Sequence, residues 1–477
     1  MNDQNISFFD RLNLWVRKSV TVKLISVGIL ILVLLIPTSM LESLIRERQS
    51  LRDSATAEVS AKWGGTQVVG GVVISIPYIT IAKNEKGENF STTSWAHFLP
   101  NQLDINGTIN PEKRNRGIYV VVLYNTILKI SGNFTSLNID ALSINRQNLL
   151  LNKAIVTLGI TDMKGIKDAI AIKINDEIKN FEPGILTNDI FTSGVSFPLD
   201  LNPFLEDSKF TFKNKLNFNF NLNLNGSSEI YFLPFGQETN VSIKSAWKNP
   251  GFEGTFLPDT RTVDENGFKA DWKVLQLNRN YPQQGLGSYI NLNNVAVDGY
   301  NNNYEIAQNT FQSNANITSE AGFGIRLLLP IDEYQKTMRS AKYAVMFIIL
   351  TFLIFFFIEI INKKRIHPIQ YLLVGFAICL FYILLLSISE QLSFNWAYLI
   401  GCIAILSLIT FYGYYVLRSK KLTAMMSFIL AILYGFFYSL LQLEDYALLM
   451  GSIGLLIILS IVMYFTRNID WYNREDN

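Results

Sequence analysis

Residues 215–226 read KLNFNFNLNLNG, a strict alternation of apolar and polar side chains. In an extended chain successive side chains point to opposite faces, so the apolar residues share one face and the asparagines the other. The apolar residues are Leu216, Phe218, Phe220, Leu222 and Leu224. A strand of an outer-membrane barrel and a strand of a water-soluble sheet both have this period of two, so the rest of the chain must decide between them.

The composition separates the chain into apolar and mixed regions. Of its 477 residues 49% are hydrophobic, which is high for a water-soluble protein, and they are concentrated near the C-terminal end. Residues 42–342 have the mixed composition of a globular domain and are rich in asparagine. The formal net charge of +2 gives no electrostatic reason for a nucleic-acid partner, and we expect none.

Six segments without Lys, Arg, Asp or Glu indicate transmembrane helices, which need roughly 20 apolar residues each. They are residues 24–41, 343–358, 366–389, 391–417, 422–443 and 446–466. Six helical spans are typical of an inner-membrane protein rather than of a membrane barrel. We therefore interpret residues 215–226 as a half-buried strand of a domain between the first and second spans.

The charges that flank the spans predict the topology. Lys and Arg lie before the first span, between the second and third, between the fourth and fifth, and after the sixth. Because short basic segments stay in the cytoplasm, both termini are predicted to be cytoplasmic and residues 42–342 periplasmic. The predicted order is a cytoplasmic N-terminus (1–23), a first helix (24–41), the periplasmic domain (42–342), a five-helix bundle (343–466) and a cytoplasmic tail (467–477).

Strand patterns dominate the predicted periplasmic domain. We expect a β-rich fold with antiparallel sheets, as a sandwich or as two stacked units. Asn266 and Gly267 separate two candidate strands and tolerate the positive φ of a tight hairpin, and NEKGE at 84–88 is a second turn candidate.

Apolar residues at helical spacing after residue 41 predict that the first helix continues outward as a stalk; a solvated linker is the alternative. A cleaved signal peptide is disfavoured by the length of the first apolar run.

The chain offers few residues for catalysis or metal binding. Its two cysteines, Cys379 and Cys402, lie in apolar runs, and together with two histidines they cannot form a Cys- or His-rich zinc site. We expect no metal and no cofactor. His97 is the only histidine of the predicted periplasmic domain, and no G-x-S-x-G motif accompanies it. We expect a surface or strand-end role for His97 and no enzymatic activity.

Acidic residues near the membrane lie at the ends of the predicted spans. Glu359 is expected to reach the lipid headgroups. Ion-coupled transport would place ionisable groups near the midplane, so transport is the less favoured alternative. Charge pairs are also expected to couple the domain to the bundle, the alternative being that these charges only orient the topology. The candidates are Lys336, Arg339, Lys342, Glu390, Glu444 and Asp445.

Small residues recur on three helix faces and predict close helix packing, because packing rather than water exclusion drives association in lipid. We expect all three faces to build the bundle core, and a homodimer seam is the alternative use. The residues are Ala397, Gly401 and Ala404, then Ala431, Gly435 and Ser439, then Ala447, Gly451 and Gly454.

Several stretches resemble conserved blocks of the CreD inner-membrane proteins, in order from about Trp63 to Trp471. One departure is the pair Gly70 and Gly71, where the family is expected to have Gly-Pro. The similar stretches are AKWGGTQVVGGVVISIPY, FLPNQLDINGTINPEKRNRGIYVVVLY, SAWKNPGFEGTFLPDTR, GFKADWKVLQLNR, RLLLPIDEYQKTMRSAKYAVMFIILTF, HPIQYLLVG, FYILLLSISEQLSFNWAY and LEDYALLMGSIGLL.

The resemblance implies a role in envelope integrity and stress responses and brings no catalytic residues with it. We therefore predict a non-enzymatic inner-membrane protein whose periplasmic domain binds an envelope component or a partner protein. Its other expected partners are membrane lipids and, as one option, further copies of itself. A transporter of a lipid or small molecule, gated by the periplasmic domain, and an accessory subunit of a sensor are the alternatives.

Overall fold

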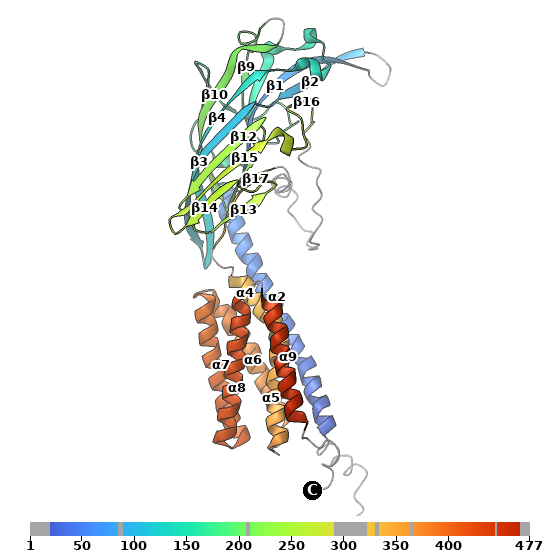
Figure 1. Ribbon diagram of the computed structural model, residues 1–477, viewed down its shortest axis with the longest axis vertical. Coiled ribbons are helices and arrows are strands. Elements are labelled where there is room, and N and C mark those ends of the chain that lie inside the picture. The colour runs from blue at the N-terminus through green and yellow to red at the C-terminus, as the bar shows by residue number, and fades with distance from the viewer. Residues whose placement is uncertain are drawn as a thin grey trace, which may run out of the picture. The chain divides into compact units, whose positions relative to one another are not determined.

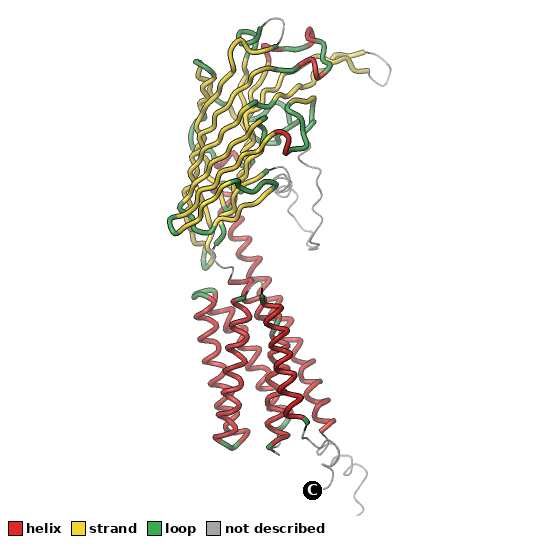
Figure 2. The backbone as a smooth tube through the Cα atoms, viewed as in Figure 1, coloured by secondary structure: helices red, strands yellow, loops and turns green. Residues whose placement is uncertain are grey.

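The computed structural model describes residues 20–83, 89–206, 210–290, 322–329, 333–362, 364, 366–443 and 446–467. It divides into two compact units, Met1–Arg52 with Ile331–Asn477, and Asp53–Pro330. The first unit is helical and the second consists mainly of strands, as Figure 1 and Figure 2 show. The helical unit includes residues 333–342, which the sequence-based boundary at residue 342 had assigned to the sheet domain.

The helices are α2 (Val20–Trp63), α4 (Glu333–Lys342), α5 (Ala344–Ile361), α6 (Pro368–Ser389), α7 (Phe394–Leu417), α8 (Lys420–Gln442) and α9 (Ala447–Thr466). Within the described residues, six of these helices, α2 and α5 to α9, are long and apolar enough to cross a membrane, in agreement with the sequence. The 44 residues of α2 extend about 66 Å, well beyond a hydrocarbon layer of about 30 Å. The first span therefore continues as a helix, as predicted.

Aromatic side chains fill the core of the helical unit. The rings of Phe347 and Tyr434 lie 4.3 Å apart, and Phe381 packs edge-on against Tyr398 at 5.4 Å and Tyr434 at 5.3 Å. The Tyr398 hydroxyl also donates to the carbonyl of Tyr434 at 2.8 Å. Such ring pairs contribute about 0.5–1.5 kcal/mol each beyond burial, so they bind α5, α6, α7 and α8 to one another.

Two sheets make up the second unit. The nine-stranded sheet has the order β13 (Pro250–Gly254), β17 (Phe323–Leu327), β11 (Glu229–Leu233), β1 (Gln67–Lys83), β5 (Ala154–Ile160), β9 (Gly194–Leu199) and β8 (Glu182–Pro183), with β2 (Asn89–Phe98) paired to β1 and to β16 (Gln284–Leu286). The eight-stranded sheet has the order β14 (Thr260–Asp264), β15 (Gly267–Leu275), β12 (Glu238–Ser245), β3 (Gln102–Arg116), β4 (Tyr119–Ser136), β10 (Thr211–Ser227), β6 (Ala171–Ile174) and β7 (Glu177–Asn180).

Most neighbouring strands are antiparallel, as expected, but each sheet contains one parallel pair. β1 runs parallel to β11, and β3 runs parallel to β12. The partners are far apart in the chain, with Gln67 opposite Ile230 and Gln102 opposite Glu238. Hairpin patterns report only strands that are neighbours in sequence, so they could not predict these two pairs.

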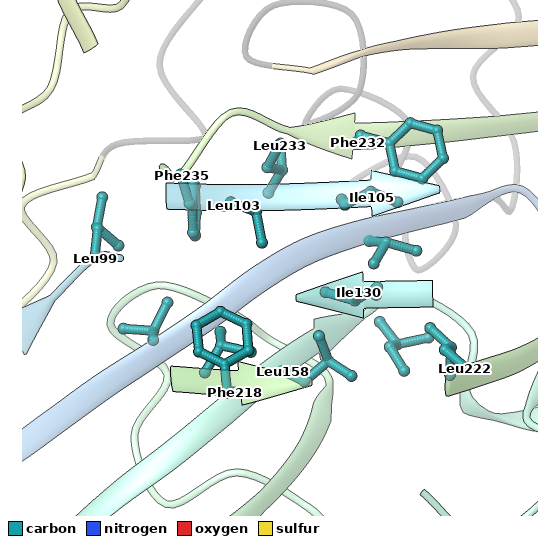
Figure 3. Packing of buried hydrophobic residues seen from close by; sticks show 14 of the residues in the cluster. Leu99, Leu103, Ile105, Ile130, Leu158, Phe218, Leu222, Phe232, Leu233 and Phe235 are labelled. Carbon is teal, nitrogen blue, oxygen red and sulfur yellow. The ribbon is translucent and has the colours of Figure 1, made fainter. Parts of the chain in front are cut away.

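The alternating stretch 215–226 lies in β10. Its five apolar side chains are between 0 and 5% exposed, whereas Asn217, Asn219 and Asn221 point to solvent. The buried side belongs to a core that both sheets share; Figure 3 shows Phe218 and Leu222 of β10 in that core with Leu158 of β5. Burying one such side chain contributes about 1.5–3 kcal/mol. The prediction of a half-buried strand is confirmed.

The two predicted turns have different outcomes. β14 and β15 form a hairpin in which Asp264 is paired with Gly267, and Gly267 has φ +135°, which a residue with a side chain rarely adopts. Residues 84–88, the second candidate, lie outside the described residues, although β1 and β2 are paired up to Lys83 and Asn89 on either side of them.

The glycine pair at 70–71 fits the same fold. A Cβ on Gly70 would lie 2.3 Å from the ring of Phe191, so this position requires glycine. The pairing register of β1 with β5 shifts between Gly70 and Val72. A Cβ on Gly71 would lie 2.9 Å from the Leu103 side chain, so this position is crowded as well.

Candidate functional site

The outward side of the eight-stranded sheet is polar across five adjacent strands. β15, β12, β3, β4 and β10 are neighbours, and their registers align outward side chains in rows. We call these rows the polar face. They are Lys273, Asn240, Asp104, Ser131 and Asn219; then Asp271, Ser242, Asn106, Lys129 and Asn221; and then Leu275, Glu238, Gln102, Asn133 and Asn217.

The polar face contains a hollow of about 500 Å³ that extends from β14 to β4. Side chains from strands far apart in the chain meet there because β3 and β12 are paired in parallel. Most of the lining residues carry an amide, a hydroxyl or a carboxylate group. The lining residues are Asp104, Asn106, Ser131, Asn240, Val241, Ser242, Asp259, Thr260, Asp271, Trp272 and Lys273.

Hydrogen bonds hold the polar groups of this hollow in place. The Asn240 amide donates to Asp104 Oδ1 at 2.9 Å and to Glu238 Oε1 at 3.2 Å. The Asp259 carboxylate accepts the backbone N–H of Lys273 at 2.6 Å. Each carboxylate oxygen has further acceptor capacity, so the hollow presents fixed acceptors to a ligand.

Asp271 is the carboxylate with the most partners in the hollow. It accepts hydrogen bonds from Ser242 Oγ at 2.6 Å and Thr260 Oγ1 at 3.0 Å, and it lies 3.3 Å from Lys269 Nζ. Burial raises the pKa of Asp271, but the hydrogen bonds from Ser242, Thr260 and Lys269 lower this pKa by more, so the net shift is downward. Asp271 is therefore ionised at neutral pH.

A second hollow of about 710 Å³ occupies the next row of the polar face. Glu238 lines it and joins it to the first hollow through its ion pair with Lys273 at 3.1 Å. Hydrogen bonds from Asn240 and Lys273 lower the pKa of Glu238. Leu277, at 87% exposed, provides an apolar contact surface. The other lining residues are Asn101, Gln102, Asn133, Thr135, Lys215, Gln237, Leu275 and Gln276.

His97 lies near the end of β2, as predicted, but it is not a surface residue, because its side chain is 1% exposed. Pairing of β1 with β2 puts Ser75 opposite His97, and Ser75 Oγ lies 2.7 Å from Nδ1. On the other side of the ring, Nε2 lies 3.1 Å from Asp189 Oδ2, and Ser288 Oγ donates to Asp189 Oδ1 at 3.2 Å. The result is a Ser–His–Asp chain that the sequence did not reveal.

The charge state of this chain follows from burial. Burial lowers the pKa of His97 and the Asp189 carboxylate only partly opposes that, so the ring is neutral at pH 7. Because a carboxylate only accepts, Nε2 carries the proton and the Ser75 hydroxyl donates to Nδ1. Ser75 is 1% exposed and does not line the neighbouring 120 Å³ cavity, which Asp189 and Ser288 do line. Among the described residues the Ser75 hydroxyl is covered, so this Ser–His–Asp arrangement lacks the accessible nucleophile that covalent catalysis uses.

Four of the six candidate coupling residues lie in the described part of the helical unit; Glu444 and Asp445 lie outside the described residues. Lys336 Nζ donates to Gln442 Oε1 at 3.2 Å. Glu390 accepts a hydrogen bond from Tyr334 at 3.3 Å and lies 3.8 Å from Arg48 Nε. Arg339 and Lys342 lie in the last turn of α4. These contacts tie α2, α4, α6 and α8 together within the helical unit, and coupling to the sheet domain stays a prediction.

Glu359 is buried at 2% exposure, contrary to the expectation that it reaches the headgroups. It forms an ion pair with Lys23 of α2. Its two carboxylate oxygens accept the backbone N–H of Ile366 at 2.7 Å and the Tyr371 hydroxyl at 2.8 Å. A buried carboxylate is stable only with such partners, and the long-range contacts that supply them have no local sequence signal.

The small-residue face of α7 is only partly in the core. Ala397 is fully buried, and a Cβ on Gly401 would lie 3.1 Å from the ring of Phe381. Ala404, by contrast, is exposed. α6 and α7 are thus packed closely at the Gly401 end of this face.

The other two faces also differ from one another. A Cβ on Gly454 would lie 2.2 Å from the ring of Phe436, and one on Gly451 would lie 3.4 Å from Leu440, so α9 packs against α8 there, with Ala447 half-buried. The face of α8 lies outside the core, contrary to expectation, because α8 buries its large side chains instead. Its three exposed residues are Ala431, Gly435 and Ser439.

The sequence contained an unused signal for the polar face. QLDINGTIN at 102–110 and ETNVSIK at 238–244 alternate polar and apolar residues as β10 does. Each stretch predicts a half-buried strand with one polar side. What the sequence lacked was the order of these strands, which depends on the parallel pairing of β3 with β12.

Comparison with known proteins places the whole chain in one group. The family described as "Inner membrane protein CreD" matches residues 19–472. Inner membrane protein CreD of Escherichia coli (strain K12) is 31% identical over 447 residues, which cover 93% of this chain and 91% of that protein. The family match includes the described helices and the two sheets.

Proposed function

Because this chain belongs to the CreD family of inner membrane proteins, we propose that it is a non-enzymatic protein of cell envelope integrity. In this proposal the six helices anchor it in the inner membrane, both termini are cytoplasmic, and the sheet domain lies in the periplasm. The sheet domain binds an envelope component through the polar face.

The observation that carries the proposal is the hollow on the polar face. Its carboxylates and amides are oriented by hydrogen bonds before any ligand arrives, as in Asn240 to Asp104 and Ser242 to Asp271. Orienting such groups in advance reduces the entropy lost on binding. The hollow of about 500 Å³ gathers these oriented groups around one space.

Two further observations favour binding over the alternatives. The Ser75 hydroxyl is buried away from the cavity beside Asp189, which argues against hydrolysis by the Ser–His–Asp chain. Aromatic rings pack the described core of the helical unit, and its buried carboxylate, Glu359, is paired near the end of α5 rather than at a midplane site. This arrangement supports an anchor more than a transporter.

The proposal is tested with the full chain in lipid nanodiscs. The probes are purified peptidoglycan sacculi and vesicles of phosphatidylethanolamine and phosphatidylglycerol. We expect sacculi or vesicles to retain the protein and Asn106→Trp, which fills the first hollow, to reduce retention. Asn110→Trp is the matched control, because Asn110 is exposed on the same strand four residues away but does not line either hollow.

Two results contradict the proposal. In one, neither sacculi nor vesicles retain the protein above empty nanodiscs. In the other, both tryptophan variants bind as the unaltered chain does, which would place any binding outside the polar face. Equal thermal unfolding midpoints for the two variants ensure that lost binding is not lost folding.

A further inference from the structure

We propose that the ligand of the polar face is a glycan, a chain of uncharged sugars rich in hydroxyl groups. This inference rests on the proposed function and names the chemical class of the ligand for the same site. Three features of the site support a glycan: the hydrogen-bonding groups that line it, the charges of its side chains and the combined length of the two hollows.

The lining chemistry suits hydroxyl groups. Sugar hydroxyls both donate and accept hydrogen bonds. Carboxylates can accept the hydrogen bonds that these hydroxyls donate, and amides can both donate and accept. The first hollow supplies acceptors from Asp104 and Asp259 and both donors and acceptors from Asn106. A lipid chain or an apolar peptide would leave these polar groups without partners, which costs about 1–3 kcal/mol for each group.

The charges argue against an anionic ligand. The first hollow contains three carboxylates, Asp104, Asp259 and Asp271, and one cation, Lys273. A phosphate group, whether on a lipid or on a nucleic acid, would be repelled. The carboxylates already accept hydrogen bonds from Asn240, Ser242, Thr260 and the Lys273 backbone, so part of their charge is compensated within the sheet. The acceptor capacity that remains on these oxygens can receive sugar hydroxyls, and oligolysine serves as the competing cationic probe in the test.

The extent of the surface favours a polymer over a single sugar. Gln102 of the second hollow and Asp104 of the first are two residues apart on β3, about 6.6 Å along the strand. Glu238 and Lys273 join the two hollows. At the far end, Leu277 gives the C–H face of a sugar ring an apolar contact. Several sugars can therefore bind in a row.

The test measures binding to full-length protein in nanodiscs by isothermal titration. The probes are chitin oligomers, which are uncharged chains of N-acetylglucosamine, neutral glucan oligomers, the stem peptides alone and oligolysine. We expect the chitin oligomers, the glucan oligomers or both to bind, and the affinity to rise with chain length. Asn106→Trp should weaken binding at least about tenfold, and Asn110→Trp should leave it unchanged. Asn106→Ala, which removes only hydrogen bonds, should weaken it less.

The two glycan probes distinguish possible sources. Binding of chitin oligomers alone indicates a glycan of N-acetylated sugars, as in the cell wall, and binding of glucan, with or without chitin oligomers, indicates a general hydroxyl site. Binding of stem peptides, oligolysine or vesicles without either glycan overturns the inference while the proposed function stands. Retention by sacculi that neither glycan competes away also overturns the inference while the proposed function stands. Failure of sacculi and vesicles alike removes the proposed function as well.

Discussion

His97 is held between Ser75 and Asp189, with both of its ring nitrogens in hydrogen-bond contact. Pairing of β1 with β2 supplies Ser75, and a segment 92 residues further along the chain supplies Asp189. The ring also stacks on Tyr289 with centroids 6.3 Å apart. These contacts suit a neutral imidazole, so protonation should act against the fold.

We therefore expect His97 to make the sheet domain sensitive to acid. Its pKa in the folded state is below the usual value of about 6.5, so the unfolded chain binds more protons in that range. The contribution to stability is present above pH 6.5 and is lost as pH falls through the folded pKa, with a slope of at most about 1.4 kcal/mol per pH unit. Thermal unfolding of the full chain between pH 8 and pH 5 measures this slope.

His97→Gln should flatten the pH dependence and lower stability at pH 7.5 by about 1–2 kcal/mol. The matched control is His367→Gln, because His367 is exposed at the start of α6. If the two variants retain the same slope as the unaltered chain, carboxylates rather than His97 govern the acid response.

At the scale of elements, the cluster around Glu359 joins α2, α5 and α6. We expect Glu359→Leu to destabilise the helical unit by about 1–3 kcal/mol, because the Tyr371 hydroxyl, the Ile366 N–H and the Lys23 ammonium all lose their acceptor. Denaturant titration in mixed detergent micelles measures the change.

Glu42→Leu is the control for this prediction. Glu42 lies on the partly exposed side of α2 in an i,i+4 pair with Arg46 at 3.6 Å, and such pairs contribute about 0.3–0.5 kcal/mol. Equal destabilisation by the two substitutions would show that burial of the Glu359 cluster adds nothing to the stability of the bundle.

Local sequence patterns predicted the elements of the fold but not the contacts between distant elements. Local periodicity identified β10, the six long helices and the hairpin at Gly267, because each depends on neighbours in the chain. The hollow depends on β3 meeting β12, more than 130 residues apart, as in Gln102 opposite Glu238. The buried partners of Glu359 and His97 are likewise contributed by distant segments. Interactions of this kind are fixed by packing and have no local pattern.

At the scale of the whole molecule, two different solvents explain why the two units are built so differently. The sheet unit buries apolar faces against each other and exposes asparagines, as a water-soluble domain must. The helices instead expose large apolar side chains such as Leu448, Phe428 and Phe411 and pack through aromatic rings. Side chains of this kind are stable on a surface that faces lipid.

Cysteine labelling tests the predicted orientation directly. Both native cysteines, Cys379 and Cys402, are buried in the helical unit, so the chain has a low background for thiol reagents. In spheroplasts, a membrane-impermeant maleimide should label Asn110→Cys in the sheet domain without lysis and Arg467→Cys only after lysis, since both positions are exposed. The opposite pattern would put the sheets in the cytoplasm. The polar face would then have no access to an envelope glycan, however well its hollows suit one.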